Sequence, residues 1–416
     1  VIEESRGSLN NIYSFNGPLT DKQWMAVDRY PGSSFYNSLY VSYIEIDAVS
    51  QTYTLTLARK RADSAQFDTT KAYLTDSSFS FVQFGSVTIG FNGTVQVSFF
   101  GSKDNVNFGI YHTYSDDGGH TFTTPQKIAD IQLPQFSAGQ QNVSVDGIAD
   151  ARFYPSVYNA SSPNSDHIYV SWTANGLTQK DSDGLDIYFA YSADGGDSFS
   201  NPVVINDDTS QSAHQYYSAI SVSPSGRLDL SWYDRRGDTA NIQTHYYIAS
   251  SNNNGLSFDH NTRITGMATD FSTVGSLNNE FGVGEYNAVL STEDYIIPIW
   301  ADGRSNDGNL DIYAAFVHEN SLSVERLVSM DKDFQMKELY PNPASQQVTV
   351  KIQADRPGDY VIRVMDIQGR QLLQYAEKLS SGLNVLHYNF NELSAGTYFF
   401  AVESDRNLEV QKLIIQ

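Results

Sequence analysis

The 416-residue chain contains no cysteine, which excludes disulfide bonds, thiolate zinc sites and a cysteine nucleophile. Basic residues are also scarce, because 26 Lys and Arg stand against 48 Asp and Glu, for a net charge of −22. So acidic a chain cannot neutralise a run of phosphates, and we expect neither a nucleic-acid partner nor adhesion to anionic lipid. No apolar run approaches the roughly 20 residues that a membrane-spanning helix needs, so no transmembrane segment is expected.

Aromatic residues, in contrast, are abundant: 27 Tyr, 23 Phe and 4 Trp make up 13% of the chain, which favours β-sheet. The charge is distributed unevenly. Residues 331–416 carry 9 basic and 11 acidic residues, whereas residues 1–330 carry 17 basic and 37 acidic residues, a net charge of −20. This shift predicts an acidic body over residues 1–330, a short linker over 331–336 and a nearly neutral tail over 337–416.

One apolar strand signature recurs five times along the body, at intervals of 56 to 73 residues. Its copies are residues 39–43, 95–99, 168–172, 228–232 and 296–300. A shorter strand precedes each copy, a more aromatic strand follows it, and a fourth strand closes most units. Helical periodicity is nowhere sustained. The pattern predicts an all-β chain whose body is a β-propeller of five clear four-stranded blades, with a sixth blade left open.

The loops between third and fourth strands share a turn pattern, S-x-D-x-G-x-T/S-F. Two close copies begin at Ser115 and Ser192, and a weaker copy begins at Ser251. The repeated positions are Asp117, Gly119, Phe122, Asp194, Gly196, Phe199, Asn253, Gly255 and Phe258. An Asp in such a turn accepts backbone N–H bonds, glycine adopts a positive φ, and the aromatic ring packs between blades. We therefore expect these positions to be structural and not catalytic.

These turns resemble the Asp-box of sialidase-like propellers, and residues 21–28, 232–236, 282–286 and 300–304 resemble further landmarks of bacterial BNR-repeat proteins. The resemblance implies a propeller that binds glycans or proteins, or one that cleaves glycosides as a retaining exo-sialidase. A sialidase needs three arginines around the substrate carboxylate, a Tyr–Glu nucleophile pair and an acidic proton donor. The arginine-isoleucine-proline motif of the sialidase N-terminal strand is missing here, which favours the non-catalytic binding function.

Candidate ligand residues follow from the topology, because antiparallel strands place alternate loops on opposite faces of a propeller. The ligand-binding candidates opposite the turns are Arg152, Arg235, Arg236 and Arg304, and the catalytic candidates are Glu285 and Tyr286. Guanidinium groups suit a carboxylate, and a glutamate can serve as general base for attack by tyrosine. Neighbours on a strand point to opposite sides, so Glu285 and Tyr286 face one substrate only if the backbone bulges. Alternatively, Arg236 pairs with Asp234, and Arg304 with Asp302, to brace their loops.

Two acidic stretches have oxygen ligands at spacings that calcium accepts. Their candidate ligands are Asp181, Asp183, Asp186, Asp307 and Asp311. Neither stretch is an EF-hand, and acidic turns are common in a chain this acidic. No cofactor is therefore expected, with a structural calcium ion as the alternative.

The tail alternates apolar and polar residues between turns, which predicts a small C-terminal β-sandwich. Three motifs follow one another in it. They contain Pro341, Asn342 and Pro343, then Asp366, Gly369 and Arg370, and finally Gly396 and Tyr398. Together they resemble the type A sorting domain of the type IX secretion system of Bacteroidota.

That resemblance implies export through the periplasm to the outer cell surface or the medium. The implied partners are the outer-membrane translocon and its shuttle and sortase components. We expect a secreted or surface-displayed protein whose propeller binds a glycan or a protein, with a sialidase-type glycoside hydrolase as the alternative. Whether the tail is retained or removed is left open.

Overall fold

The structure is a computed structural model that describes most of the chain. The described residues are 19–47, 49–50, 52–132, 156–179, 184–210, 212–273, 286–305, 310–319, 334–366, 370–404 and 408–416. Within them, the only helical elements are a 3-10 segment, η1 (Phe271–Thr273), and an isolated 3-10 position at Glu319. No helix in these ranges is long and apolar enough to cross a membrane.

The chain forms two compact units, the first ending at Ala315 and the second beginning at Phe316. The predicted domain limit at residue 330 falls within residues 320–333, which lie outside the described ranges, and the limit at residue 337 falls within β22 (Phe334–Tyr340). Those limits stay a prediction. Each unit is described by itself below.

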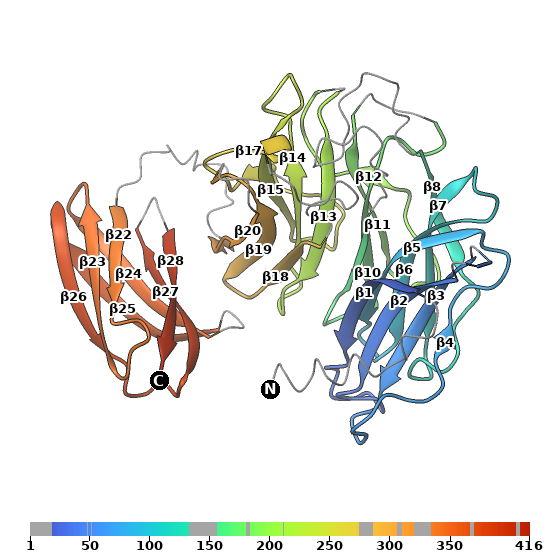
Figure 1. Cartoon of the computed structure of the whole chain (residues 1–416), viewed down its shortest axis with the longest axis horizontal. Helices are drawn as coiled ribbons and strands as arrows, with labels where there is room; N and C mark the ends of the chain where they lie inside the picture. The colour runs from blue at the N-terminus through green and yellow to red at the C-terminus, as the bar shows by residue number, and fades with distance from the viewer. Residues whose placement is uncertain are drawn as a thin grey trace. The chain divides into compact units, whose positions relative to one another are not determined.

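The first unit contains five antiparallel sheets that follow one another along the chain (Figure 1). Sheet 1 consists of β1 (Leu19–Val27), β2 (Leu39–Asp47), β3 (Thr52–Lys60) and β4 (Ala72–Tyr73). Sheet 2 consists of β5 (Phe81–Ile89), β6 (Val95–Ser102), β7 (Phe108–Ser115) and β8 (Gln126–Ile131). Sheet 3 consists of β9 (Val157–Ser161), β10 (Ile168–Ala174), β11 (Asp186–Ser192) and β12 (Val203–Val204).

Sheets 4 and 5 complete the first unit. Sheet 4 consists of β13 (Gln215–Val222), β14 (Leu228–Asp234), β15 (Gln243–Ser251) and β16 (Thr262–Arg263), and β17 (Thr269–Asp270) also pairs with β15. Sheet 5 contains β18 (Ala288–Ser291), β19 (Tyr295–Asp302) and β20 (Asp311–Ala314). The five sequence signatures fall in the second strands β2, β6, β10, β14 and β19, as predicted.

The sheets are arranged as blades, because the first strand of each lies against the first strand of the next, from β1 through β5, β9 and β13 to β18. Each neighbouring pair shares an apolar core. Between sheets 4 and 5, for example, the ring of Tyr246 stacks on that of Trp300 at 4.7 Å. Fully burying an aromatic ring such as Trp172 or Trp232 contributes about 4 to 6 kcal/mol before entropy costs. The predicted β-propeller is confirmed.

A serine in the strand signature accounts for part of the contact between blades. Ser42, Ser98, Ser171 and Ser231 are all fully buried. The Ser42 hydroxyl donates to the Gly85 carbonyl in sheet 2 at 2.6 Å. Ser218 in sheet 4 donates to Ser171 in sheet 3 at 3.1 Å. A short polar side chain at this position can therefore join one blade to the next.

Three of the first strands carry a β-bulge near their start. The pairing register shifts in β1, β5 and β13, and the bulges hold Lys22, Phe84 and Tyr217 at φ of 55°, 52° and 52°. Positive φ is an outlier for bulky residues, and a bulge redirects side chains. The bulges therefore determine the direction of the side chains near the start of these first strands.

The second unit begins with β21 (Val317–His318) and continues as a two-sheet sandwich. Its sheets are ordered β22-β23-β26 and β25-β24-β27-β28. The strands are β22 (Phe334–Tyr340), β23 (Gln347–Ala354), β24 (Gly358–Met365), β25 (Gln371–Leu379), β26 (Gly382–Asn389), β27 (Gly396–Glu403) and β28 (Leu408–Ile415). One apolar cluster, which includes the fully buried Val350, Ile362 and Phe400, fills the space between them. The predicted C-terminal β-sandwich is confirmed.

Candidate functional site

The strand order sorts the loops of the propeller onto two faces. The repeated turns follow the third strands β7, β11 and β15, so they share one face. The second strands end, and the first strands begin, on the face across from them, which we call the opposite face. Arg235, Arg236, Arg304 and Tyr286 lie there. Arg152 and Glu285 lie outside the described residues.

The three turns share a set of internal hydrogen bonds. Asp117 Oδ1 accepts the backbone N–H groups of His120 and Thr121 at 2.9 Å, and the Gly119 N–H donates to Ser115 Oγ at 2.8 Å. Burial raises the pKa of Asp117, but hydrogen bonds from Thr121 and Ser115 outweigh it and hold that pKa below its usual value.

The other two turns repeat this arrangement. Asp194 and Asn253 each accept the backbone N–H four residues later at 2.9 Å. The glycines at the fifth position of the turns, Gly119, Gly196 and Gly255, have φ of 82°, 100° and 81°. These bonds and angles explain the residue pattern without any ligand.

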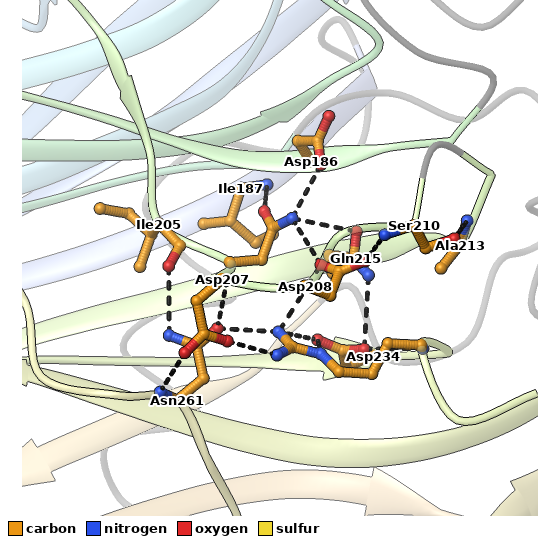
Figure 2. Close-up of polar contacts among 12 residues, drawn as sticks. Asp186, Ile187, Ile205, Asp207, Asp208, Ser210, Ala213, Gln215, Asp234 and Asn261 are labelled. Atoms are coloured by element: carbon orange, nitrogen blue, oxygen red, sulfur yellow. Dashed lines mark hydrogen bonds and ion pairs between the residues drawn. The ribbon is translucent and has the colours of Figure 1, made fainter.

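Arg236 contacts Asp207 and Asp208 in the loop that connects sheets 3 and 4. Figure 2 shows these two aspartates together with Asp234 and Asn261. Arg236 Nη1 lies 2.5 Å from Asp207 Oδ1 and its Nη2 lies 2.8 Å from Asn261 Oδ1, while its Nε donates to Asp234 Oδ2 at 2.9 Å. The guanidinium also stacks over the Tyr247 ring at 4.6 Å. Burial lowers the pKa of Arg236, but Asp234 and Asp207 outweigh it and raise that pKa. All three guanidinium nitrogens therefore have partners within the framework.

The same network contains Asp186, one of the calcium candidates. Asn206 Nδ2 donates to Asp186 Oδ1 at 2.8 Å and to Asp208 Oδ1 at 2.9 Å, and Asn206 Oδ1 accepts the Ile187 N–H at 2.9 Å. Asp311 is an exposed residue at the start of β20.

Asp181, Asp183 and Asp307 lie outside the described residues. Within the residues that the structure describes, no group of three or more His, Cys, Asp or Glu side chains is arranged to hold a metal ion.

Arg235 is 4% exposed. Its Nε donates to Thr244 Oγ1 at 3.0 Å and its Nη1 donates to the Asn241 carbonyl at 2.8 Å. The guanidinium also lies over the Tyr216 ring at 5.2 Å. Its partners thus come from the loop that follows it and from the first and third strands of its own sheet.

Arg304 pairs with Asp302 through Nη2, and its backbone N–H donates to Asp302 Oδ1 at 2.9 Å. Its guanidinium stacks on the Tyr313 ring at 4.4 Å. Burial raises the pKa of Asp302, but hydrogen bonds from Arg304 and Thr269 outweigh it and lower that pKa. The ion pairs Asp234–Arg236 and Asp302–Arg304, the alternative suggested by the sequence, are both present.

The structure adds a role for these aspartates that the sequence analysis missed. Trp232 Nε1 donates to Asp234 at 2.9 Å, and Trp300 Nε1 donates to Asp302 at 2.8 Å. In sheet 3, Ala174 stands where the acid would be, and in the described part of the chain the buried indole N–H of Trp172 has no acceptor. An aromatic residue followed two positions later by an acid, read in phase with the strand repeat, is the signal that could have revealed it.

A second group on the opposite face consists of Lys22, Phe84 and Tyr286, which we call the collar. Lys22 Nζ lies 4.8 Å from the centroid of the Phe84 ring and 5.5 Å from that of the Tyr286 ring. Tyr286 is 54% exposed. Side chains from the first strands of sheets 1 and 2 and from just before that of sheet 5 therefore meet, although they are distant in the sequence.

In the second unit, the first sorting motif is bonded to the last strand. Asn342 Nδ2 donates to the Lys412 carbonyl at 2.6 Å, and Asn342 Oδ1 accepts the Ile414 N–H at 2.9 Å. The Ala344 N–H donates to the Ile414 carbonyl at 2.8 Å. Asn342, between Pro341 and Pro343, thus fastens its loop to β28.

The other two motifs also make internal bonds. Asp366 accepts the Arg370 backbone N–H at 3.0 Å and its Nε at 2.7 Å, and the Tyr398 hydroxyl donates to the Ser394 carbonyl at 2.7 Å. Gly396 begins β27, and Gly369 lies outside the described residues. The motif residues therefore hold turns and strand ends of the sandwich.

Residues 338–416 match the family described as a secretion system C-terminal sorting domain. No curated protein matches the sequence. The prediction of a type IX sorting domain is confirmed, and it indicates export to the cell surface or secretion.

Three of the solved structures similar to this chain are the following. A protein of unknown function from Dyadobacter fermentans is 13% identical with a TM-score of 0.45, over 88% of this chain and 95% of that one. The Hadza microbial sialidase Hz136 is 12% identical with a TM-score of 0.40, over 92% of this chain and 74% of that one. An α-L-arabinofuranosidase from Fusarium graminearum is 10% identical with a TM-score of 0.42, over 74% of this chain and 95% of that one.

Proposed function

We propose that this exported propeller is a binding module that receives a glycan or a protein on its opposite face, and that it is not a sialidase. The observation that carries the proposal is the way the arginines are held. Arg235, Arg236 and Arg304 each bond to groups of the propeller itself, and no two of them share a partner in the described ranges.

A sialidase site needs several guanidinium groups free to converge on one carboxylate. A substrate carboxylate at Arg236 would have to displace Asp207 and Asp234, which already bond to it. Arg235 is almost entirely buried. This arrangement supports an opposite face on which the arginines are already paired within the propeller. A ligand bound there would not be recognised through a cluster of arginines.

We also propose that the turns at residues 115–122, 192–199 and 251–258 are Asp-boxes and that the body is a BNR-repeat propeller of bacterial origin in the Bacteroidota. The support is that all three turns share one set of hydrogen bonds in phase with the blade repeat. In this assignment the tail over residues 337–416 engages the translocon, shuttle and sortase components, and residues 1–330 form the cargo.

Two assays of the full chain test the binding function. On an array of immobilised glycans and in a pull-down from the outer surface of the producing cells, we expect saturable binding to at least one ligand. With a fluorogenic sialoside we expect no turnover. Turnover that disappears in Tyr286→Phe while sialoside binding remains would replace the binding function with the hydrolase alternative.

A further inference from the structure

We propose that the collar of Lys22, Phe84 and Tyr286 binds one neutral sugar residue of a glycan where the first strands of the propeller begin. This inference rests on the proposed binding function and specifies its site and its ligand class. The proposed ligand site is thus the collar and not the arginines, and the sequence analysis did not bring these three residues together.

The three collar residues occupy equivalent places in their blades. In β1, Lys22 lies two positions before Trp24, which pairs with Ser42. In β5, Phe84 lies two positions before Ser86, which pairs with Ser98. Tyr286 likewise lies two positions before Ala288, which pairs with Ile299 at the serine position of the fifth signature. The blade repeat therefore brings the same position of three blades together.

The residue types at these places indicate that the side chains have a role beyond shaping the backbone. Lys22 and Phe84 have φ of 55° and 52°, a region that glycine or asparagine adopts at lower cost. A bulge that served only the backbone would favour those residues. At the equivalent position of sheet 4, the Tyr217 ring packs edge-on against Tyr216 and Tyr233, so that position serves the core.

The chemistry of the collar suits a sugar. The half-exposed ring of Tyr286 offers a flat apolar face for the C–H face of a pyranose, and its hydroxyl offers a polar contact. Lys22 carries three N–H donors and is positioned over both aromatic rings. A few polar groups around an apolar surface are typical of a small-ligand site.

The charge of the body favours a neutral sugar over an acidic one. Residues 1–330 carry a net charge of −20, which repels an acidic sugar and other anionic ligands.

The size of the collar favours a sugar over a protein partner. A stable protein interface buries about 800 Å² on each partner, far more than three side chains provide. One pyranose ring, in contrast, is comparable in size to a tyrosine side chain. We therefore commit to a glycan, and a protein ligand becomes an outcome of the test.

The test uses the full chain and four neutral probes, the methyl glycosides of glucose, galactose, mannose and xylose, with glucuronate as the acidic comparison. Binding is followed by saturation-transfer NMR and calorimetry. We expect at least one neutral glycoside to bind, and glucuronate to bind no more tightly than glucose. Tyr286→Ala should weaken binding at least tenfold.

Lys22→Gly removes the ammonium but keeps the positive φ. It should weaken binding at least fivefold without lowering the Tm. The matched control is Lys103→Met, because Lys103 Nζ also lies over an aromatic ring, Phe79 at 4.9 Å, but outside the collar. This control should leave binding unchanged.

The outcomes distinguish the proposed collar site from the proposed binding function. If the full chain binds a glycan and both collar variants bind it as tightly as the unaltered chain, the collar is not the binding site and the binding function stands. Tighter binding of glucuronate, or binding of a protein alone, overturns the neutral-sugar class. If neither glycan nor protein binds, the proposed function fails as well.

Discussion

The two units of this protein are stabilised in different ways. The propeller contains an ion pair that is almost completely buried between two blades, whereas the sorting domain encloses one apolar cluster and its ion pairs, among the described residues, are all at least partly exposed. In the first unit, the side chains of the ion pair Arg227–Asp229 are 3% and 0% exposed. In the second, those of Lys378–Asp359 are 85% and 81% exposed.

The difference follows from architecture. Neighbouring blades meet as sheet faces whose apolar contacts alone do not fix how one sheet is aligned on the next. Arg227 donates to the carbonyls of Glu293 and Thr292, at the turn between β18 and β19, at 3.0 Å each. These directional bonds tie sheet 4 to sheet 5. A sandwich that closes around one cluster has no such repeated joint, and we infer that it needs fewer buried polar bonds.

The largest effect is expected from separating the two units. Deleting residues 338–416 removes the sorting domain, so the propeller should lose export and accumulate inside the cell envelope. Immunodetection on intact and on permeabilised cells measures this. Normal amounts of the truncated protein at the surface would contradict the role of the second unit.

Next in size is the loss of the buried ion pair. Arg227→Met leaves Asp229 buried without its partner and should lower the free energy of unfolding of the first unit by about 3 to 5 kcal/mol. All four tryptophans lie in the first unit, so their fluorescence follows that unit in denaturant.

The control for that prediction is Lys378→Met in the sorting domain. Because both partners of this pair are exposed, it should leave the calorimetric transition of the second unit unchanged within error. Equal losses in the two variants would contradict the contrast between the units.

A smaller effect is expected from adjacent glycines in the turn of sheet 3. A Cβ on Gly196 would lie 2.7 Å from His112 Nε2 and 2.9 Å from Gln96 Oε1 in sheet 2, whereas a Cβ on Gly195 would meet nothing within 4 Å. Gly196→Ala should cost about 2 to 4 kcal/mol through strain and overlap. Gly195→Ala, which only strains the backbone, should cost about 1 kcal/mol. Urea unfolding followed by tryptophan fluorescence compares them, and similar costs would show that the turn does not rest closely on the preceding blade.

The last effect concerns acid sensitivity. Burial lowers the pKa of His112 to about 3 from an ordinary value of 6.5. The unfolded chain therefore binds the proton first, and stability is lost as the pH falls from about 6.5 towards 3, by up to about 1.4 kcal/mol per pH unit. His112→Leu should remove this part of the slope, because the equivalent positions in sheets 1 and 3 hold Leu57 and Phe189. Denaturant titrations at pH 7 and pH 5 measure the change, and an unaltered slope would contradict it.

The sequence predicted those parts of the fold that are written in local patterns. The strand signatures gave the second strands, and the spacing of Asp117 and Gly119 gave a turn whose bonds depend on neighbours in the chain. Likewise, the ion pair of Arg236 with Asp234, two residues away, could be considered as an alternative in advance.

Long-range contacts could not be predicted in this way. Asp207 and Asn261, which also bond to Arg236, lie 29 and 25 residues from it. Asp207 reaches it from the loop between sheets 3 and 4, and Asn261 from between β15 and β16 of the same sheet. The collar could not be predicted for the same reason, because its residues are distant in the sequence. In addition, nothing in a sequence marks a β-bulge when the bulged residue is Lys or Phe instead of Gly. Register shifts depend on the pairing of whole strands, which a local pattern does not contain.

The hydrogen bonds between Asn342 and β28 have a consequence for biosynthesis. Its partners are 70 and 72 residues further along the chain. A ribosome therefore completes the first sorting motif long before the strand that secures it. Any product that terminates before residue 408 lacks this strand and cannot close the domain. We expect such fragments to be left behind, so that the sorting domain acts as a proofreading step that admits only fully translated chains to export.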